Sequence, residues 1–413
     1  MESIGCIALV EWTWKGHHPI YFNQFILALE ELGYDVLAVC PDPKVAEAAA
    51  DATRQISNAT ISNRGRSQFV KFQNPALGFN RLRAARINAI ELNIRRHISV
   101  EHQVRKWAKK SGRKVYAIFY ACMYDWDFEC THLAQPFLRI PWTGLYLHAM
   151  SYRMPGRPHP LTGRVPCPKK MFSGRLCKGI AILDEGIAER VSISIGKPVV
   201  VFPDLSDERL ATSVRERVLG ERLKRFADGR PIVGLFGHLH GSKGILTFLE
   251  TAQMPAASEI CFALGGEMAW NNDEGANSQI QVALAECPNL WSHLARIPDG
   301  PCLNGVMTAC DVIFAAYWDF PHSSNIMTKA AVLKKVLIVS DGYLMAERLR
   351  RFNLGEIIPQ ANAGALLDAI LKITQDPEGW VANNKPQWES YCHEHSFERL
   401  KVGLRGLLAP LRA

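Results

Sequence analysis

Short runs of consecutive apolar residues alternate along the chain with segments whose apolar residues recur at helical spacing. The first run, residues 4–10, is typical of a central parallel strand. A glycine-containing loop follows, then an amphipathic segment that closes at Gly33, and then a second apolar run, residues 35–39. This order of strand, helix and strand predicts that the chain opens with a βαβ unit.

The same alternation continues to the C-terminus and predicts two sets of strands, with a break at Pro203 and Asp204. The further predicted strands are residues 115–121, 142–147, 179–183 and 199–202 in the first set, and residues 232–236, 260–264, 312–315, 336–339 and 356–358 in the second. We therefore predict an α/β protein with two Rossmann-like, doubly wound domains that face a cleft. The predicted domains are residues 1–205 and 206–387, and a C-terminal helix, residues 388–413, is expected to return to the first domain.

Length and composition fit this organisation. A chain of 413 residues is too long for one ordinary core, and 48% hydrophobic with 21% charged residues is a normal globular balance. The eleven cysteines include no C-x-x-C pair, so neither a zinc knuckle nor a disulfide framework is favoured. No apolar run approaches about 18 residues and no signal-type segment opens the chain, so we expect a soluble, cytoplasmic protein.

The net charge of +8 is concentrated in one segment, residues 81–114. Its cations, which face only Glu91 and Glu101, are Arg81, Arg83, Arg86, Arg95, Arg96, Arg105, Lys106, Lys109, Lys110, Arg113 and Lys114. Apolar residues between them keep helical spacing, which predicts a basic amphipathic helix in peripheral contact with an anionic membrane or a lipid-linked acceptor. A solvated helix face and a nucleic-acid site are the alternatives. No nucleic-acid motif accompanies the charge, so we expect no nucleic-acid partner.

One stretch of the second predicted domain, residues 231–250, carries a candidate phosphate site. Its apolar run breaks at Gly237 and apolar residues resume at helical spacing from Ile245, with Lys243 at the helix start. Backbone N–H groups and the positive end of a helix dipole attract an anion at such a turn, and a lysine adds a full charge. The alternative is an ordinary βα turn with a solvated lysine.

In the first predicted domain, polar residues follow the ends of three strands. Gly16, His17 and His18 lie after the first strand, Asp125 after residues 115–121 and His148 after residues 142–147. Carboxyl ends of parallel strands meet at one edge of a sheet, so these residues are expected to converge on one crevice. Neighbouring side chains of extended chain point to opposite faces, which suggests a structural role for one of the two adjacent histidines.

With these residues in view, the chain resembles GT-B-fold glycosyltransferases over nearly its whole length, and is most similar to the family 4 type that uses nucleotide-sugar donors. The N-terminal part of the likeness is the glycine loop at residues 16–18 and the strand entry Gly33-Tyr34-Asp35-Val36. Family members follow a strand with glycine, arginine and then lysine-glycine, and the two cations grip the donor diphosphate. The same spacing here is Gly237, His238, Lys243 and Gly244, with histidine in place of arginine.

The segment of residues 310–341 also resembles the donor loop, helix and strand of the family, but the usual glutamates eight positions apart are absent. Pro321 and Lys329 occupy their places. The resemblance therefore implies the phosphate grip but not the retaining stereochemistry. Lys329 is expected to turn toward the diphosphate, or else to lie on the outer helix face. The donor-side candidates that remain are Gly266 and Glu267 after residues 260–264, and His322, Ser323 and Ser324, whose serines could instead be a plain N-cap.

The resemblance implies transfer of a sugar from a nucleotide-diphosphate sugar to a hydroxyl acceptor, which could be a glycan, a lipid-linked molecule or a small molecule. The base is expected among His17, His18 and Asp125, and His148 resembles the histidine that touches the donor sugar. Asp125 with Asp127 imitates a D-x-D metal motif only weakly, so we expect neither metal nor cofactor. The main alternative is a catalytically inactive sugar- or nucleotide-binding protein of the same fold, which a donor turnover assay distinguishes.

Overall fold

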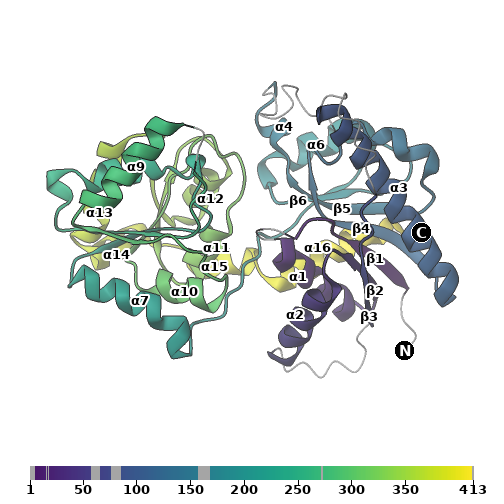
Figure 1. The fold of residues 1–413 in the computed structure, drawn as a ribbon, viewed down its shortest axis with the longest axis horizontal. Helices are drawn as coiled ribbons and strands as arrows, with labels where there is room; N and C mark the ends of the chain where they lie inside the picture. Colours follow the sequence, from purple (N-terminus) through teal and green to yellow (C-terminus); the bar gives the residue numbers. More distant parts are fainter. Residues whose placement is uncertain are drawn as a thin grey trace. The chain divides into compact units, whose positions relative to one another are not determined.

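The computed structural model describes residues 5–411 apart from residues 15, 17, 57–65, 76–84, 157–167 and 271–272. The chain divides into two compact units, Met1–Pro203 with Ser396–Ala413, and Asp204–His395. Each unit is a parallel sheet with helices on both faces (Figure 1), which confirms the predicted α/β class with two Rossmann-like sheets. None of the helices in the described part of the chain combines the length and the apolar character that a bilayer crossing requires.

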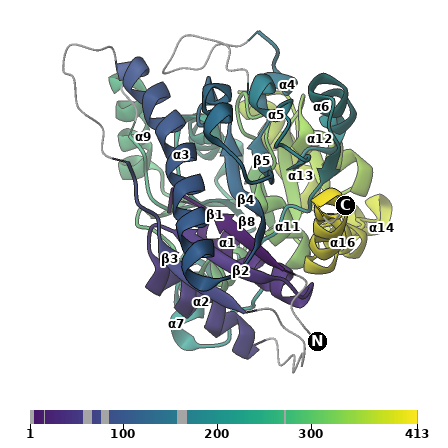
Figure 2. The same cartoon turned by 90° about the vertical axis from the view of Figure 1, so that its right-hand side faces the viewer.

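The first unit contains a seven-stranded sheet in the order β3-β2-β1-β4-β5-β6-β7. Its strands are β1 (Cys6–Val10), β2 (Asp35–Cys40), β3 (Ser67–Lys71), β4 (Val115–Tyr124), β5 (Trp142–His148), β6 (Ile180–Ile182) and β7 (Val199–Val201). Its α-helices are α1 (His18–Glu31), α2 (Pro43–Ile56), α3 (Ala85–Ser111), α4 (Met150–Arg153), α5 (Lys169–Phe172), α6 (Ala188–Ile195) and α16 (Phe397–Leu408). The long helix α3 runs past β1 and β4 (Figure 2).

The C-terminal helix α16 packs on the sheet of the first unit. Gly403 lies so close to the Phe202 ring that an added Cβ would be 2.9 Å from it. Phe202 stacks in turn on Phe119 of β4, at 6.5 Å between ring centroids. An ion pair of 2.9 Å between Lys401 and Glu31 joins α16 to α1. A glycine in α16 therefore allows the helix to approach a buried aromatic cluster.

The second unit contains a six-stranded sheet in the order β10-β9-β8-β11-β12-β13. Its strands are β8 (Ile232–Phe236), β9 (Cys261–Gly265), β10 (Leu290–His293), β11 (Val312–Ala315), β12 (Val336–Ser340) and β13 (Gly355–Ile358). Its α-helices are α7 (Val214–Ala227), α8 (Ile245–Ala252), α9 (Glu274–Glu286), α10 (Pro301–Thr308), α11 (Asn325–Val332), α12 (Leu344–Phe352), α13 (Ala363–Thr374), α14 (Pro377–Asn384) and α15 (Trp388–Glu394).

Strand order reverses at one point in each sheet, between β1 and β4 in the first unit and between β8 and β11 in the second. Chain connections leave in opposite directions from such a point, so the loops at the carboxyl ends of the two strands diverge and leave room for a ligand. The central strands β1 and β8 are completely buried. The loops that follow β1, β4, β8 and β11 are therefore where binding residues are expected.

Candidate functional sites

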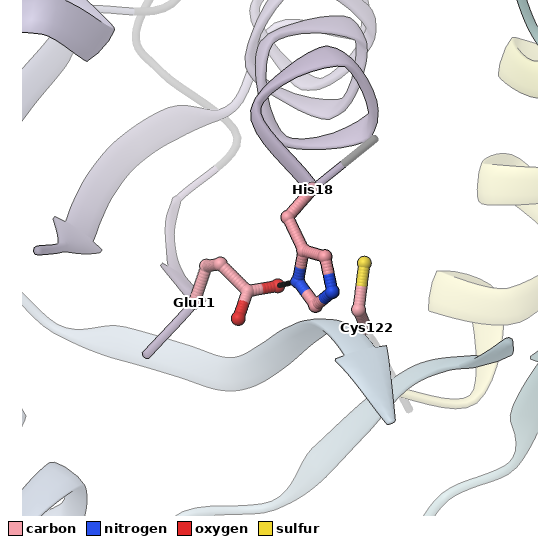
Figure 3. Close-up of side chains that lie close together, drawn as sticks. All are labelled: Glu11, His18 and Cys122. Carbon is pink, nitrogen blue, oxygen red and sulfur yellow. Dashed lines mark ion pairs between the residues drawn. The ribbon is translucent and has the colours of Figure 1, made fainter. Parts of the chain in front are cut away.

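Glu11 follows β1 directly and faces His18, the first residue of α1 (Figure 3). The Nδ1 atom of His18 lies 2.9 Å from Oε2 of Glu11, and Oε1 accepts a hydrogen bond of 2.8 Å from the backbone N–H of Thr13. The exposed fractions of Glu11 and His18 are only 2% and 7%. Because a carboxylate offers acceptors alone, the imidazole proton belongs on Nδ1.

The other ring nitrogen of His18 contacts β4. Its Nε2 atom lies 2.7 Å from the hydroxyl of Tyr124, which donates the hydrogen bond when the ring proton is on Nδ1. The thiol of Cys122, also on β4, lies beside the same ring (Figure 3), and burial raises its pKa well above the usual range, with Glu11 adding to the effect. The switch point between β1 and β4 thus holds a carboxylate, an imidazole, a thiol and a phenol.

Two further aromatic groups surround Tyr124. The edge of the His148 ring meets the Tyr124 ring at 4.9 Å between centroids, and Trp126 stacks on its face at 4.6 Å. Trp126 is 38% exposed, whereas Tyr124 is buried. The expected convergence of His18 and His148 therefore occurs, through contacts that both make with Tyr124.

Asp125 lies in the same loop but faces β5 and α4. Its carboxylate accepts hydrogen bonds from the Tyr146 hydroxyl, from the backbone N–H of Ser151 at 3.3 Å and from the Ser151 hydroxyl at 3.1 Å. Burial raises its pKa to about 6, and these hydrogen bonds oppose the shift. Its carboxylate is therefore engaged inside the unit.

The glycine loop before α1 is only partly described. Gly16 has a φ of +56°, a left-handed conformation that favours glycine, and an added Cβ would meet no atom within 4 Å. His17 lies outside the described residues. The assignment of the base to one of the two adjacent histidines stays a prediction.

In the second unit, the loops after β8 and β9 touch through two glycines. Gly266 has a φ of +143°, and an added Cβ would lie 1.7 Å from the carbonyl oxygen of Gly237. The backbone N–H of Gly237 donates to the Gly265 carbonyl at 3.0 Å, and that of Leu239 donates to the Glu267 carbonyl at 2.9 Å. Only glycine at 266 permits this approach, so the shape of the β8 loop depends on it.

Lys243 ends a short 3-10 helix before α8 and lies over aromatic residues that follow β11. Its Nζ atom is 3.7 Å from the centroid of the Tyr317 ring and 5.5 Å from that of Phe320. Gly244, with a φ of +70°, is the N-cap of α8, and an added Cβ would lie 2.5 Å from the Ala316 carbonyl oxygen. These contacts hold a cation at the carboxyl ends of β8 and β11, at the start of α8.

Two histidines near this loop, His240 and His322, contribute little positive charge. Burial lowers the pKa of His240 to about 4, with a further contribution from Lys243, and burial lowers that of His322 to about 4. His238 is exposed, with its ring 5.7 Å from that of His240. Lys243 therefore provides the fixed charge of this loop near neutral pH.

The serines before α11 have different surroundings. Ser323 donates a hydrogen bond to Asp204 and accepts one of 2.6 Å from Arg348, so its hydroxyl belongs to a buried ionic cluster. Ser324 occupies the N-cap position of α11 without a capping hydrogen bond from its side chain. Ser324 therefore has the position of an N-cap, but its side chain does not cap the helix.

Lys329 is buried within the second unit, with no exposed side-chain surface. Its Nζ atom lies 2.6 Å from Oδ1 of Asp299, 3.1 Å from the carbonyl oxygen of Asp207 and 3.3 Å from Oδ1 of Asn304. An ammonium group has three donors, and these three oxygens engage all of them. The lysine therefore differs from both expectations, an outer-face position and an orientation toward a diphosphate.

A separate basic groove of about 660 Å³ lies at the C-terminal end of α3. The residues that line it include His102 and four cations, Arg105, Lys106, Lys109 and Lys114. Val115, the first residue of β4, also lines it, so the groove lies at the amino edge of the sheet, opposite to Tyr124. The helix predicted in the basic segment is present as α3, although Arg81 and Arg83 lie outside the described residues and Arg113 and Lys114 follow the helix. The groove at its C-terminal end lies away from the candidate acceptor residues.

Sequence reasoning did not single out several residues of these sites. Glu11, Cys122 and Tyr317 are buried. Each comes after an apolar run that predicts a strand. The signal for Glu11 was an acidic residue directly after a completely apolar strand, where a parallel sheet places ligand-binding groups.

No model of a known protein family matches the chain, and no curated protein sequence matches it. Its fold is similar to that of solved GT-B glycosyltransferases. HepE from Anabaena, in complex with UDP-glucose, is 12% identical with a TM-score of 0.66, and the match covers 98% of this chain and 99% of that one. Sucrose-phosphate synthase from Thermosynechococcus elongatus is 16% identical with a TM-score of 0.69, over 98% and 99% of the two chains.

A third similar structure is the UDP-forming α,α-trehalose-phosphate synthase from Burkholderia xenovorans, which is 11% identical with a TM-score of 0.64 over 98% of each chain. These likenesses extend over both units and establish the fold class. The identities are too low to carry over a substrate or a catalytic residue.

Proposed function

We propose that this protein transfers a sugar from a nucleotide-diphosphate sugar to a hydroxyl acceptor. The observation that carries the proposal is the β8 loop of the second unit, where an added Cβ on Gly237 would meet no atom within 4 Å and Lys243 is held at the start of α8. Such a loop suits a diphosphate. Solved structures of HepE with UDP and with UDP-glucose, which share the fold over 98% of this chain, support the choice of ligand.

On the donor side, the departing diphosphate needs positive charge and N–H donors. Lys243 and the start of α8 offer both, and the exposed His238 can add a donor. The Tyr317 hydroxyl is buried and has no hydrogen-bond partner among the described residues, so it too is available to a ligand. We propose that these groups neutralise the diphosphate without a metal ion or a cofactor. The loop after β9 supports them, because Gly266 packs against Gly237 and the Glu267 carbonyl accepts a hydrogen bond from Leu239.

On the acceptor side, we propose His18 as the proton acceptor. In the reaction, the bond from the anomeric carbon to the diphosphate oxygen breaks, a bond to the acceptor oxygen forms, and the acceptor proton passes through the Tyr124 hydroxyl to Nε2 of His18. Glu11, 2.9 Å from Nδ1, would stabilise the imidazolium that results. His148, in contact with Tyr124, is the candidate for a sugar contact. Asp125 would hold Tyr146 and Ser151 in place.

The alternative function is sugar or nucleotide binding without catalysis. It is favoured by one observation, the presence of Pro321 and Lys329 where the resembled family has two glutamates. Lys329 donates to protein oxygens, so it offers no acceptor for a ribose hydroxyl.

One experiment separates the two functions. The purified protein is incubated with a panel of nucleotide sugars, and both thermal stabilisation and release of the nucleotide diphosphate are measured. Stabilisation by one donor together with release supports the transferase. Stabilisation without release, in the presence of glycan, lipid-linked and small-molecule acceptors, supports the binding protein. Absence of both effects across the panel would remove the donor-site assignment.

We also propose peripheral contact with an anionic membrane through the basic segment, residues 81–114, at the inner face of the cytoplasmic membrane. The support is the groove of α3, whose exposed cations gather on one helix face. Because this groove lies at the sheet edge away from Tyr124, it suits attachment to a surface better than binding of the reacting acceptor.

A further inference from the structure

We propose that Glu11, His18 and Cys122 form a binding site for a transition-metal ion of the zinc type. Each residue offers one ligand atom, and these atoms all lie within 4.8 Å of one another. They come from three places that the fold fixes independently: the residue directly after β1, the start of α1 and the carboxyl-terminal part of β4 (Figure 3). Their exposed fractions are 2%, 7% and 3%. The site is therefore enclosed, unlike the exposed acidic clusters that occur on many surfaces.

The distances are close to those of a metal site. Ligand atoms about 2.0–2.3 Å from a tetrahedral ion are separated by about 3.5 Å. The contact between Glu11 and His18 is already shorter than this, at 2.9 Å. The most distant pair, at no more than 4.8 Å, would need to approach by up to about 1.3 Å, which rotation of the His18 and Cys122 side chains can supply. No rearrangement of the sheet is required.

Charge also favours an ion at this place. The Cys122 thiol and Nδ1 of His18 both face the Glu11 carboxylate, so two protons now lie among the three side chains. A divalent cation would displace the thiol proton and shift the ring proton from Nδ1 to Nε2, and so bind a carboxylate, a thiolate and a neutral imidazole. The resulting cluster has no net charge, which suits a buried position. Three protein ligands leave a fourth position for water, as in many zinc sites.

The donor set selects the class of ion. A thiolate with an imidazole favours Zn²⁺ over the oxygen-preferring Mg²⁺ and Ca²⁺. The proposed site is on the first unit, so it is distinct from the donor diphosphate loop around Lys243. It does not depend on the proposed function. An ion on Nδ1 would, however, leave the remaining ring proton on Nε2, so the metal-loaded chain could not use His18 as a base.

The test uses Co²⁺ as a spectroscopic substitute for Zn²⁺. Protein treated with a chelator is titrated with Co²⁺, and absorption is recorded for the thiolate-to-cobalt charge-transfer band and the intense d–d bands of a tetrahedral site. We expect saturation at one equivalent, displacement by Zn²⁺, and no displacement by a large excess of Mg²⁺. Cys122→Ser should remove the charge-transfer band and weaken binding by more than about a hundredfold, beyond the usual cost of losing an outer-sphere partner.

Cys40→Ser is the matched control, because Cys40 is also completely buried and ends the neighbouring strand β2. It should leave the spectrum unchanged. A wild-type spectrum without the charge-transfer band, or one that Cys122→Ser leaves intact, would overturn the proposal and leave an ordinary Glu11–His18 ion pair. If Cys122→Ser does not fold, Glu11→Gln must weaken Co²⁺ binding at least tenfold, and unchanged affinity in that variant would equally overturn the site.

Discussion

The backbone N–H of Asp204 donates a hydrogen bond of 3.0 Å to Nδ1 of His395. These are the first and last residues of the second unit, so one bond joins the points where the chain enters and leaves it. Both residues are buried, at 2% and 6% exposure. Because Nδ1 accepts, the imidazole is neutral, with its proton on Nε2. Burial, together with Arg348 and Arg351, lowers its pKa to about 2.

His395→Ala should lower the free energy of unfolding of the second unit by about 1–3 kcal/mol at pH 7, because it leaves a buried N–H without an acceptor. His395→Asn should cost much less, since its side-chain oxygen can accept the same bond. Urea denaturation monitored by tryptophan fluorescence measures both changes. His393→Ala is the control, because His393 is exposed on α15, the helix that His395 caps at its C-terminal end. Equal effects of His395→Ala and His393→Ala would contradict the role of the Asp204 bond.

The same residue should make stability depend on pH. Between about pH 2 and 6.5 the unfolded chain protonates this histidine while the folded chain does not. The unfolded state then binds more protons, so stability falls as the pH drops below 6.5, by up to about 1.4 kcal/mol per pH unit. His395→Asn has no proton to bind and should show a correspondingly shallower decline from pH 7 to 5. Parallel curves for wild type and this variant would show that His395 titrates normally.

The sequence predicted the central strands well, for a physical reason. A strand covered by helices on both faces needs a continuous apolar run, and β1 and β8 have one. The edge strands β3 and β10 were missed because they are half exposed: residues 67–71 include two charged or polar exposed positions, and β10 buries only Leu290. Such strands form because a neighbour offers free backbone groups, which a local pattern does not reveal.

The candidate sites were predicted to the extent that their chemistry is local. The turn with Gly237, Lys243 and Gly244 can be recognised because all its parts lie within one βα unit. The partner of His18 is Tyr124, more than a hundred positions away, and only strand pairing brings them together. The burial of Lys329 likewise depends on Asp299 and Asp207, which come from separate loops. Long-range pairing of this kind has no sequence signature in a single chain.

Lys329→Met should destabilise the second unit by about 3 kcal/mol, because removal of one partner leaves Asp299 and two other oxygens without their donor. Asp299 is 34% exposed and can partly rehydrate, so adding Asp299→Asn should recover part of the loss. The control is Lys334→Met, which breaks an exposed ion pair with Glu389 and should change stability by less than about 1 kcal/mol. Chemical denaturation of the four proteins checks this, and wild-type stability of Lys329→Met would refute it.

Gly266→Ala should destabilise the second unit by more than about 3 kcal/mol and weaken nucleotide-sugar binding. The added Cβ would overlap the Gly237 carbonyl oxygen at 1.7 Å, and a φ of +143° is strained for alanine. Gly364→Ala is the matched control in α13, since its Cβ would meet only an ordinary contact at 3.6 Å. It should be neutral or stabilise by up to about 1 kcal/mol. Thermal unfolding of both variants shows whether the loss of stability comes from the overlap with Gly237 or from replacing a glycine as such.

Replacement of Arg105, Lys106 and Lys109 by Gln should reduce binding to anionic vesicles by roughly a hundredfold at low salt, since each cation near such a surface contributes about 1 kcal/mol. The same change at Arg222, Lys224 and Arg225, three exposed cations of α7, is the charge-matched control. Flotation with neutral and with anionic liposomes measures the effect. Equal recovery of the wild type with neutral and with anionic lipid would contradict the membrane proposal. Equal losses of vesicle binding in the two triple variants would show that binding depends on net charge alone.

Lys243→Met should weaken nucleotide-sugar binding by tenfold to a hundredfold, because a charge-assisted contact to a diphosphate contributes about 1.5–3 kcal/mol. Folding should change little, since Lys243 is half-buried and methionine keeps its packing over the Tyr317 ring. Lys224→Met removes the same charge from an exposed site on α7 and should leave affinity unchanged. Calorimetric titration with the donor that stabilises the wild type gives both affinities. An unchanged affinity in Lys243→Met would contradict the assignment of the diphosphate to the β8 loop. A loss of affinity in this variant alone would support a position of the leaving group at the start of α8.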